Sequence, residues 1–483
     1  MKVVFIFPLA KAYTKSTPLK LPTSENLGIS YISSLLKTNG HSVQLVILTL
    51  NNQKDVLAAL AEIDPQLICF TSVSSEYYLI RNLAGRYKAM HPQVWLVAGG
   101  CHVSLNPEET IADSFDAICI GEGEYPVLEL VTQLEKGLYP SGIYNMWIKN
   151  DSGIEKNPLR DFVEDLDVLP FPDRQMWKKW VRYPDKRPSV LVSRGCPFQC
   201  TYCCNHKLAK LGEGKYHRFR SPKNVLGEVM ALVAECPDIE EIYFEAETIG
   251  TDMDFALQFC SELERLNHRR EKPLAFGINL KVTPKLESEK LFEALHRANF
   301  RFVNIGLESG SNRIRKEVLK RFYSNEDIVK AVALAKLYDL TVHMFVMVGL
   351  PGETREDFQE TIEVSRKCQA DMYMLSIFYP YPGTELARTC DENGLVEGSI
   401  DIEKVCERRQ PVLHQPGFSK TQVRWSYIWF DYNVYKGHKP VQQLLLRVII
   451  RMVLVQPQLD RVFDRLLNIP LFMKLKTKLV YLD

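Results

Sequence analysis

The sequence predicts an α/β protein with two successive parallel sheets and a mostly helical end. Short β-branched runs alternate with helical patterns over residues 1–135, and the same alternation resumes at Val190 and continues to about Leu386. Between the two, residues 136–188 collect Pro, Gly, Asp and Trp without periodicity. Alternating strands and helices are typical of parallel sheets covered by helices. We expect four parts, a Rossmann-like domain at 1–140, a linker at 141–188, a second domain of alternating strands and helices at 189–395 and a helical region at 396–483.

Composition indicates an ordinary soluble protein. The chain has 483 residues, 46% of them apolar, and a net charge of +1, which fits two or three globular domains. The absence of a basic excess argues against a nucleic-acid partner. Twelve scattered cysteines indicate a reducing, cytoplasmic setting rather than a disulfide scaffold. The apolar run before Pro8 is too short for a signal peptide, so we expect a first strand there.

Strand ends in the first domain carry small and polar residues. We expect strands at 2–7, 43–48, 67–71, 94–98 and 117–120, and helices at 27–38, 56–63, 78–90 and 126–135. Parallel sheets bind ligands outside the carboxyl ends of their strands, where the strand order reverses. The segments that follow strands here are 72–75, 99–102 and 121–124. Their glycines allow close approach of a ligand and their hydroxyls can hydrogen-bond it.

Three cysteines follow the first expected strand of the second domain. Cys196, Cys200 and Cys203 are spaced C-x3-C-x2-C directly after the run 189–193. Thiolates select iron–sulfur clusters, zinc and Cu(I), and three of them can leave one iron of a cluster open for a substrate. A zinc site completed by His206, or three buried apolar side chains, are the alternatives. Cys204 adjoins the motif and is interpreted as structural.

This spacing, with an aromatic residue before the last cysteine, resembles the signature of the radical S-adenosylmethionine (SAM) superfamily. The resemblance implies a [4Fe–4S] cluster on Cys196, Cys200 and Cys203, with SAM chelated by the open iron. It also implies a partial (β/α)6 barrel of the TIM type. The expected strands at 190–193, 241–244, 274–278, 302–306, 341–348 and 373–378 match that barrel.

In such barrels the chemistry lies at the carboxyl ends of the strands. The resemblance assigns SAM contacts to Tyr202, Glu245, Glu247, Asn279, Glu308, Ser309, Gly349 and Tyr379. The family's glycines are missing beside Glu245 and Glu247, so which of these two acts stays open. Lys281, at the third strand end, is a candidate for the SAM carboxylate or the substrate. Arg218 and Arg220 are further anion-binding candidates.

The first domain resembles the cobalamin-binding domain that precedes the barrel in one large branch of this superfamily. Gly28, the pair at 99–100 and the turn at 121–124 carry the similarity. It assigns cobalamin contacts to Ser72, Ser74, Glu76, Gly99, Gly100, Gly121 and Glu122. The loop 8–26 contains no histidine, so we expect no histidine ligand to cobalt, and we interpret His102 as a loop residue.

Two alternatives remain for the first domain. In the first, the domain is a Rossmann-like module that has lost its ligand or serves docking. In the second, it carries a second cluster on Cys69, Cys101 and Cys119, as in methylthiotransferases. Cys69 and Cys119 fall within apolar strand runs, where buried cysteines are common, so a second cluster is not expected.

Together the resemblances imply a cobalamin-dependent radical SAM enzyme. Its foremost expected activity is methylation of an unactivated carbon or phosphorus centre through a 5′-deoxyadenosyl radical and methylcobalamin. A non-methylating rearrangement or cyclisation and a non-catalytic iron–sulfur or cobalamin sensor are the alternatives. The substrate is expected to be a small or lipid-like molecule, and the electron donor a flavodoxin or ferredoxin. No catalytic side chain is assigned, since the radical step demands no general base.

The last region is rich in Trp, Tyr and Arg. Helices are expected at 420–435 and 441–455. The second is strongly apolar but carries two arginines, and it is too short to span a membrane. One interpretation is a buried helix that covers the open side of the barrel. The other is a basic amphipathic surface that makes peripheral contact with a membrane or holds a hydrophobic substrate.

Overall fold

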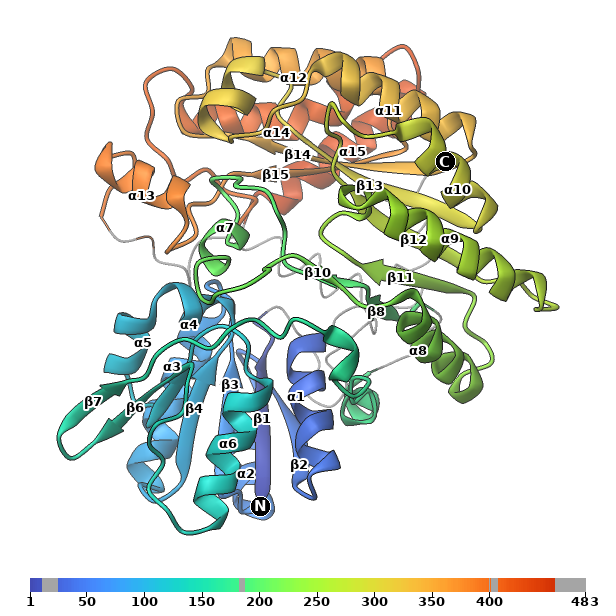
Figure 1. Ribbon diagram of the computed structural model, residues 1–483. Helices are drawn as coiled ribbons and strands as arrows, with labels where there is room; N and C mark the ends of the chain where they lie inside the picture. Colours follow the sequence, from blue (N-terminus) through green and yellow to red (C-terminus); the bar gives the residue numbers. More distant parts are fainter. Residues whose placement is uncertain (11–24, 182–186, 399, 401–406, 457–483) are drawn as a thin grey trace. The chain divides into compact units, whose positions relative to one another are not determined.

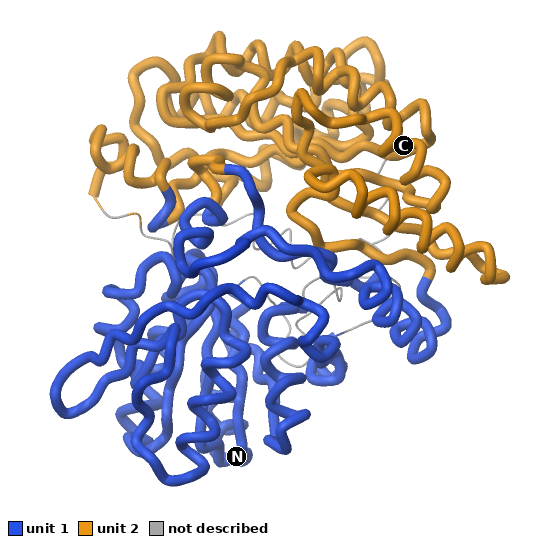
Figure 2. The backbone as a smooth tube through the Cα atoms, in the orientation of Figure 1, with its two compact units in different colours: residues 1–198, 204–239, 382–384 blue, residues 199–203, 240–381, 385–483 orange. Residues whose placement is uncertain are grey.

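The structure is a computed structural model that describes residues 1–10, 25–181, 187–398, 400 and 407–456. The chain forms two compact units (Figure 2). Unit 1 comprises residues 1–198, 204–239 and 382–384, and unit 2 comprises residues 199–203, 240–381 and 385–483. Most of the loop at 8–26, and the part of the C-terminal region beyond residue 456, lie outside the described residues.

Unit 1 is built on a seven-stranded sheet of order β2-β1-β3-β4-β5-β6-β7. The strands are β1 (Lys2–Pro8), β2 (Ser42–Leu48), β3 (Leu67–Thr71), β4 (Trp95–Gly99), β5 (Ala117–Cys119), β6 (Met146–Asn150) and β7 (Gly153–Lys156). The first five strands pair in parallel, as the sequence predicts. Because the chain order reverses at β1, the carboxyl ends of β1 and β3 mark the switch point at which ligands bind in such sheets.

Helices cover both faces of this sheet (Figure 1). They are α1 (Leu27–Thr38), α2 (Gln53–Ile63), α3 (Tyr77–Met90), α4 (Cys101–Leu105), α5 (Pro107–Ala112) and α6 (Glu124–Glu135). One apolar core joins the sheet to α2, α3, α4 and α5, and a second joins it to α1 and α6. Burial on both faces explains why the strands read as continuous apolar runs rather than as alternating patterns.

The segment predicted as a linker extends the sheet of unit 1. Strands β6 and β7 form an antiparallel hairpin, and Ile148 of β6 is fully buried. Trp177, in the 3-10 turn Gln175–Trp180, is also fully buried and donates from Nε1 to Ser30 Oγ at 2.8 Å. The sequence does not predict this hairpin, because its short strands are interrupted by Lys and Asn and lack a clear alternation.

Unit 1 ends with shorter elements that flank the cysteine motif. They are β8 (Ser189–Leu191), β9 (Ser193–Arg194), α7 (Asn205–Leu208), β10 (Arg218–Phe219) and α8 (Pro222–Glu235). Strands β9 and β10 pair in an antiparallel fashion. The cysteine motif therefore leaves a short strand, as the sequence predicts.

Unit 2 contains five consecutive parallel strands, β11 to β15, each next to its chain neighbour. They are β11 (Glu241–Glu245), β12 (Ala275–Leu280), β13 (Phe300–Glu308), β14 (Thr341–Val348) and β15 (Met372–Ile377). The helices between them are α9 (Met253–His268), α10 (Ser288–Arg297), α11 (Asn325–Leu337) and α12 (Arg355–Cys368). The expected strands two to six of the barrel are confirmed, whereas the expected first strand, β8, is counted with unit 1.

The C-terminal helices are α13 (Glu385–Glu392), α14 (Lys420–Tyr435) and α15 (Val441–Leu454). Helix α14 packs on α12, β14 and β15, and α15 packs on α14. The predicted bounds of α14 agree with the structure, since Ser419 and Gln422 form a capping box at its start. Among the described helices, none is long and apolar enough to cross a membrane.

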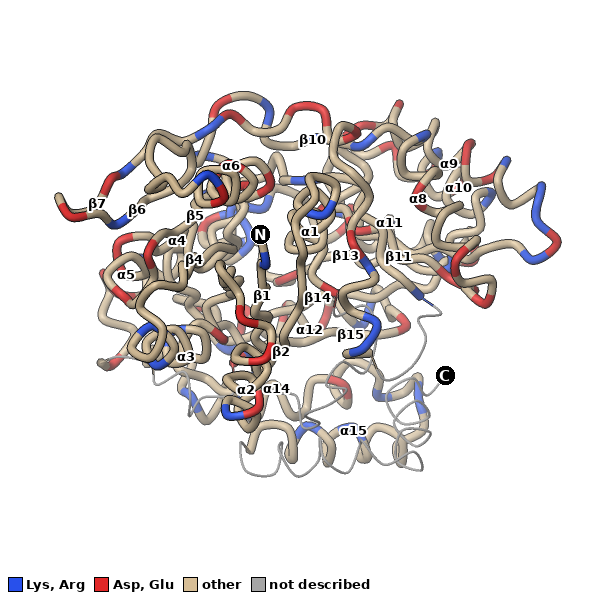
Figure 3. Tube along the Cα trace, turned by 90° about the horizontal axis from the view of Figure 1, so that it is seen from below, with Lys and Arg blue, Asp and Glu red and all other residues tan. Residues whose placement is uncertain are grey.

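Helix α15 combines features of both interpretations of this segment. Leu444 and Val448 are buried, while Val441, Leu445 and Ile449 are exposed. Arg451 is buried and its Nε donates to Asp431 Oδ2 at 2.7 Å. Elsewhere along the chain, Lys and Arg are interspersed with Asp and Glu (Figure 3), but α15 carries only basic charges.

The Arg451–Asp431 ion pair provides a test of how α15 is held. Asp431→Asn leaves a buried guanidinium without its counter-charge, so we expect a loss of about 3–5 kcal/mol of stability in this region. Urea unfolding followed by tryptophan fluorescence measures it, since α14 contains Trp425 and Trp429. In the double variant Asp431→Asn/Arg451→Met most of the loss should disappear. Equal stability of wild type and Asp431→Asn would contradict the prediction.

Candidate functional site

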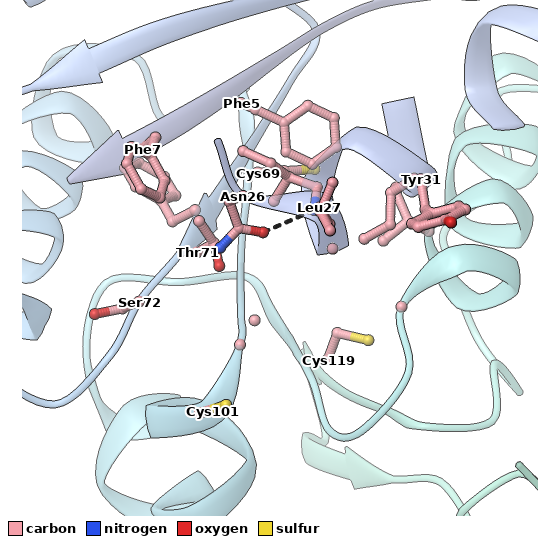
Figure 4. A pocket seen from close by; sticks show the side chains of 18 of the residues that line it. Phe5, Phe7, Asn26, Leu27, Tyr31, Cys69, Thr71, Ser72, Cys101 and Cys119 are labelled. Atoms are coloured by element: carbon pink, nitrogen blue, oxygen red, sulfur yellow. Dashed lines mark hydrogen bonds between the residues drawn. The ribbon is translucent and has the colours of Figure 1, made fainter. Parts of the chain in front are cut away.

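A cavity of ≈ 490 Å³ opens at the carboxyl ends of the parallel strands in unit 1. Residues at the ends of β1, β3, β4 and β5 and at the start of α1 line it (Figure 4). Its walls are mainly apolar, with Phe5, Phe7 and Leu27 among the side chains that Figure 4 shows around it. A cavity of this size and lining is typical of small-molecule and cofactor sites. Its place is the switch point that the strand order predicts.

Six of the seven residues that the sequence analysis assigned to cobalamin line this cavity. They are Ser72, Glu76, Gly99, Gly100, Gly121 and Glu122. Gly100 has a φ of 98°, and a Cβ there would lie 2.9 Å from Ser72 O, so a side chain does not fit. Ser74 is not among the lining residues. Its hydroxyl lies 3.1 Å from His102 Nδ1 instead.

Two carboxylates at the cavity are already engaged within unit 1. Glu76 Oε1 accepts a hydrogen bond from the Ala10 backbone N–H at 3.0 Å. Glu122 accepts hydrogen bonds from the Arg218 guanidinium, at 2.7 Å to Oε1, and from Val163 N at 2.9 Å. Burial disfavours ionisation of Glu122, but Arg218 and Arg194 outweigh burial and hold its pKa below the usual range. Glu122 therefore shapes the cavity wall as a paired carboxylate.

Arg194 is a cavity residue that the sequence analysis did not identify. It lies over the Tyr31 ring, 5.2 Å from the centroid, and donates to Glu124 Oε1 at 2.5 Å and to Glu122 Oε1 at 3.3 Å. It precedes Cys196 by two residues. The same backbone therefore forms part of the cavity wall and begins the cysteine motif. The feature of the sequence that could have pointed to Arg194 is its position directly before Gly195 and Cys196.

Arg218 and Arg220, predicted as anion-binding candidates, pair with carboxylates of unit 1. Arg218 binds Glu122, as described above, and Arg220 donates to Glu228 Oε2 at 2.5 Å and to Leu191 O at 2.8 Å. Both arginines are almost fully buried. Their contacts indicate a role in holding the strands around the cavity together.

His102, Cys69 and Cys119 have the features of core residues, whereas Cys101 is exposed. His102 is buried and stacks on Tyr77 at 4.1 Å between ring centroids, and burial lowers its pKa to about 4. Cys69, Cys101 and Cys119 all line the cavity. Burial raises the pKa of Cys119 to about 12 and raises that of Cys69 as well, so both stay protonated thiols. Because metal ligation needs thiolates, the protonated state of Cys69 and Cys119 disfavours a second cluster.

The last two candidate ligands of the cysteine motif belong to unit 2. Cys196 is counted with unit 1, whereas Cys200 and Cys203 belong to unit 2. Thr201 fixes the loop between them, because its Oγ1 donates to Val318 O at 2.6 Å and its carbonyl accepts from Leu386 N at 3.0 Å. Cys203 N donates to Cys200 O at 3.1 Å. Two thiols are therefore presented on one tight, anchored turn.

Two charged side chains of unit 2 lie near this turn. Lys281 Nζ lies 3.4 Å from Cys200 Sγ. Arg321 donates to Tyr202 Oη at 3.0 Å, to Gly306 O at 2.7 Å and to Glu308 Oε1 at 3.4 Å. Burial raises the pKa of Glu308 even with Arg321 beside it. The sequence analysis named Tyr202 and Glu308 but not Arg321, which is 119 residues from Tyr202.

The other residues assigned to SAM lie at the strand ends of unit 2 but differ in exposure. Glu245 is half-buried and Glu247 exposed, and burial together with the Glu247 charge raises the pKa of Glu245 to about 7. Asn279 Oδ1 accepts from Tyr243 Oη at 2.7 Å and from Asn304 Nδ2 at 3.0 Å. These bonds place Asn279 in a layer of polar side chains inside the barrel. The other members of this layer, Tyr243 and Asn304, were not predicted from the sequence.

Three further assigned residues are buried. The Ser309 hydroxyl accepts from Ser311 N at 3.2 Å, and Tyr379 packs against Tyr381 at 5.1 Å between ring centroids. Gly349 N donates to Glu353 Oε2 at 2.6 Å. Ser309 and Gly349 thus already have internal hydrogen bonds. Their contribution to SAM binding stays a prediction.

The donor sets fit the groups that the sequence analysis implied. Soft thiolates on an anchored turn, with a lysine ammonium at one sulfur, suit an iron–sulfur cluster. An apolar cavity with a glycine-lined floor suits part of a large planar cofactor that needs close backbone approach. Among the residues described, no three His, Cys, Asp or Glu side chains are gathered around one point so as to hold a single metal ion.

Two family models match the chain. The model for the radical SAM superfamily matches residues 190–364, and the model for the B12 binding domain matches residues 22–131. Together they cover more than half of the sequence.

Curated relatives and solved structures agree with these matches. An uncharacterized methyltransferase of Pyrococcus horikoshii is 28% identical over 405 residues, covering 82% of this chain and 84% of the relative. The anaerobic magnesium-protoporphyrin IX monomethyl ester cyclase of Rubrivivax gelatinosus is 26% identical over 373 residues, covering 74% of this chain and 65% of the relative. The radical SAM methyltransferase TsrM of Kitasatospora setae, solved with cobalamin and a [4Fe–4S] cluster, has the same fold. Its TM-score is 0.66 at 15% identity, over 96% of this chain and 99% of that chain.

Glu353, which holds the loop at Gly349, predicts a dependence of stability on pH. Burial raises its pKa from 4.5 to about 8, although Gly349 N and Leu350 N both donate to it. The folded chain thus holds this proton more tightly than the unfolded chain. The resulting stability is fully present below pH 4.5 and is lost as pH rises through 8.

We expect Glu353→Gln, which keeps an acceptor oxygen, to become more stable relative to wild type from pH 5 to 8. The gain should grow by up to about 1.4 kcal/mol per pH unit. Urea unfolding across this pH range measures it. Glu356→Gln, an exposed position three residues further on in the first turn of α12, is the control. Parallel pH profiles for wild type and Glu353→Gln would contradict the assignment.

Proposed function

We propose a specific chemistry for this chain, which belongs to the radical SAM superfamily and carries a B12 binding domain. The chain is a cobalamin-dependent radical SAM methyltransferase that acts on an unactivated carbon or phosphorus centre. The observation that carries the proposal is the presence, in one polypeptide, of the C-x3-C-x2-C motif and of a glycine-floored apolar cavity at a switch point. When bound, the cluster and SAM supply a 5′-deoxyadenosyl radical and cobalamin supplies the methyl group.

The residues of this chain bind and orient these groups. Cys196, Cys200 and Cys203 hold the cluster, and Thr201 anchors their turn. Gly99 and Gly100 give the cobalamin a floor without side chains, while Arg194 holds the wall through Glu122 and Glu124.

The strand ends of unit 2 are proposed to hold SAM. Glu245, Glu308 and Tyr202 are the foremost candidates. Glu245 is half-buried at the end of β11, and Arg321 donates to both Glu308 and Tyr202.

The partners follow from this chemistry. A one-electron donor of the flavodoxin or ferredoxin class is proposed, because the cluster must be reduced before SAM is cleaved. The substrate is proposed to be a small or lipid-like molecule, and the setting cytoplasmic, since the twelve cysteines suit a reducing compartment. The exposed apolar residues of α15 are a candidate for peripheral membrane contact.

A non-methylating cyclisation is the second candidate function, favoured by the similarity to the Rubrivivax cyclase. Anaerobic incubation with SAM, reductant and candidate acceptors, followed by mass spectrometry, separates the two. Deoxyadenosine with a product heavier by one methylene group supports the methyltransferase. Deoxyadenosine with an unmethylated product supports the second candidate.

The cluster assignment predicts different effects at Cys200 and at Cys204, four residues further along the chain. We expect Cys200→Ala, reconstituted anaerobically with iron and sulfide, to lose its four-iron content and the cleavage of SAM, because one of three thiolate ligands is removed. Cys204→Ala, next to the motif, is the matched control and should retain both. Iron and sulfide per chain and deoxyadenosine by chromatography are measured. Full SAM cleavage by Cys200→Ala would exclude this cluster.

The cobalamin assignment is tested at the cavity floor. The backbone of Gly99 is compatible with a side chain, and a Cβ there has only ordinary contact with Cys119 Cβ at 3.7 Å. We therefore expect Gly99→Val to fold but to retain at least about tenfold less cobalamin after desalting, since the added methyl groups enter a cavity that a ligand must fill. Gly85→Ala, in α3 of the same unit, is the control. Unchanged cobalt per chain in Gly99→Val would contradict this site.

A further inference from the structure

Lys281 is held in a defined position at the end of β12. It follows Leu280 directly, and Leu280 and Val282 on either side are buried. Its backbone N–H donates to Thr248 Oγ1 at 3.0 Å, and Thr248 is fully buried. The backbone on both sides of Lys281 is therefore fixed by packing and by a buried hydrogen bond. The direction in which its side chain leaves the strand is set by the fold.

The ammonium group of Lys281 reaches a sulfur of the cysteine motif. Lys281 Nζ donates to Cys200 Sγ at 3.4 Å, and both residues belong to unit 2. Cys200 is buried and Lys281 half-buried, so little water screens their interaction. A lysine ammonium only donates hydrogen bonds, and a thiolate accepts them best. The contact is thus suited to a sulfur that carries negative charge.

Two further charged side chains of unit 2, Glu308 and Arg321, lie near Lys281 and Cys200. Glu308 interacts electrostatically with Lys281 and with Arg321. Arg321, in turn, interacts electrostatically with Cys200, and its guanidinium is held by Tyr202 Oη and Gly306 O. Lys281 and Arg321 thus both place positive charge near the buried thiol.

We propose that Lys281 is a positioning residue for Cys200 that raises the reduction potential of the [4Fe–4S] cluster. The inference rests on the proposed function, because it presupposes the cluster. On reduction, one electron enters the cluster from the external donor and the negative charge of the cube and its thiolates increases by one. A cation that donates to a ligand sulfur stabilises this reduced state more than the oxidised one.

This role differs from the one expected of Lys281 on the sequence alone. A partner of the SAM carboxylate or of the substrate acts only when that molecule is bound. A donor to Cys200 acts on the cluster in the absence of SAM. The reduction potential of the SAM-free protein therefore distinguishes these two roles of Lys281.

The experiment uses the full chain, reconstituted anaerobically, in wild type, Lys281→Gln, Lys281→Arg and the control Lys272→Gln. Lys272 is exposed ahead of β12, so its substitution removes one positive charge from unit 2 without touching Cys200. Iron per chain is determined first. Redox titrations followed by electron paramagnetic resonance are then run without SAM, and SAM binding is measured separately by equilibrium dialysis.

We expect Lys281→Gln to keep four irons and to disfavour reduction about tenfold, a shift of ~59 mV to more negative potential for one electron. Lys281→Arg, which keeps the charge, should lie nearer to wild type, and Lys272→Gln should match wild type. An unchanged SAM-free potential in Lys281→Gln, with weaker binding of SAM, would overturn the inference. Absence of iron from the wild type would count against the proposed function itself, so the two failures are distinguishable.

Thr248→Val provides a second measurement if Lys281→Gln does not take up iron. It removes only the acceptor of the Lys281 backbone N–H and leaves the ammonium in place. A shift in the same direction, smaller than about tenfold, supports the inference. A SAM-free potential equal to that of wild type in Thr248→Val would overturn it.

Discussion

The parallel polarity of the strands is the constraint on which both units depend. In a parallel sheet every carboxyl end lies at the same edge, so short polar segments that follow separate strands are brought together there. In unit 1 this places the ends of β1, β3, β4 and β5 around one cavity. In unit 2 it brings the groups that follow β11, β12 and β13 to one edge. Residues far apart in sequence become neighbours without any special pairing between them.

Buried ion pairs hold in place the groups that parallel strand polarity brings together. In unit 1 the carboxylates that follow β5 are matched by Arg194 and Arg218, so the cavity wall is held by ion pairs that are largely removed from water. In unit 2 the carboxylate of Glu308, the last residue of β13, is matched by Arg321. Removing one partner of such a pair costs more than the pair itself contributes, because the remaining charge stays buried. These pairs therefore constrain geometry more than they add stability.

Secondary structure was predictable where the sequence carries strong local signals. Helix α14 begins at a capping box formed by Ser419 and Gln422, and its predicted bounds agree with the structure. The barrel strands were predictable because each is a short run rich in β-branched, aromatic and other apolar residues between helical patterns. In β11, β14 and β15 buried positions alternate with more exposed ones. The β6–β7 hairpin was not, since its strands are short and half-exposed.

The sequence by itself determined the C-x3-C-x2-C motif, the order of the parallel strands, and the glycines that follow β4 and β5. These are local features, because spacing along the chain and backbone permissiveness are properties of adjacent residues. Only the tertiary structure decided which partners these residues have. Ser74 binds His102 rather than lining the cavity, and Arg321 reaches Tyr202 across 119 residues of sequence. Such contacts depend on how distant strand ends meet, and no local pattern encodes that distance.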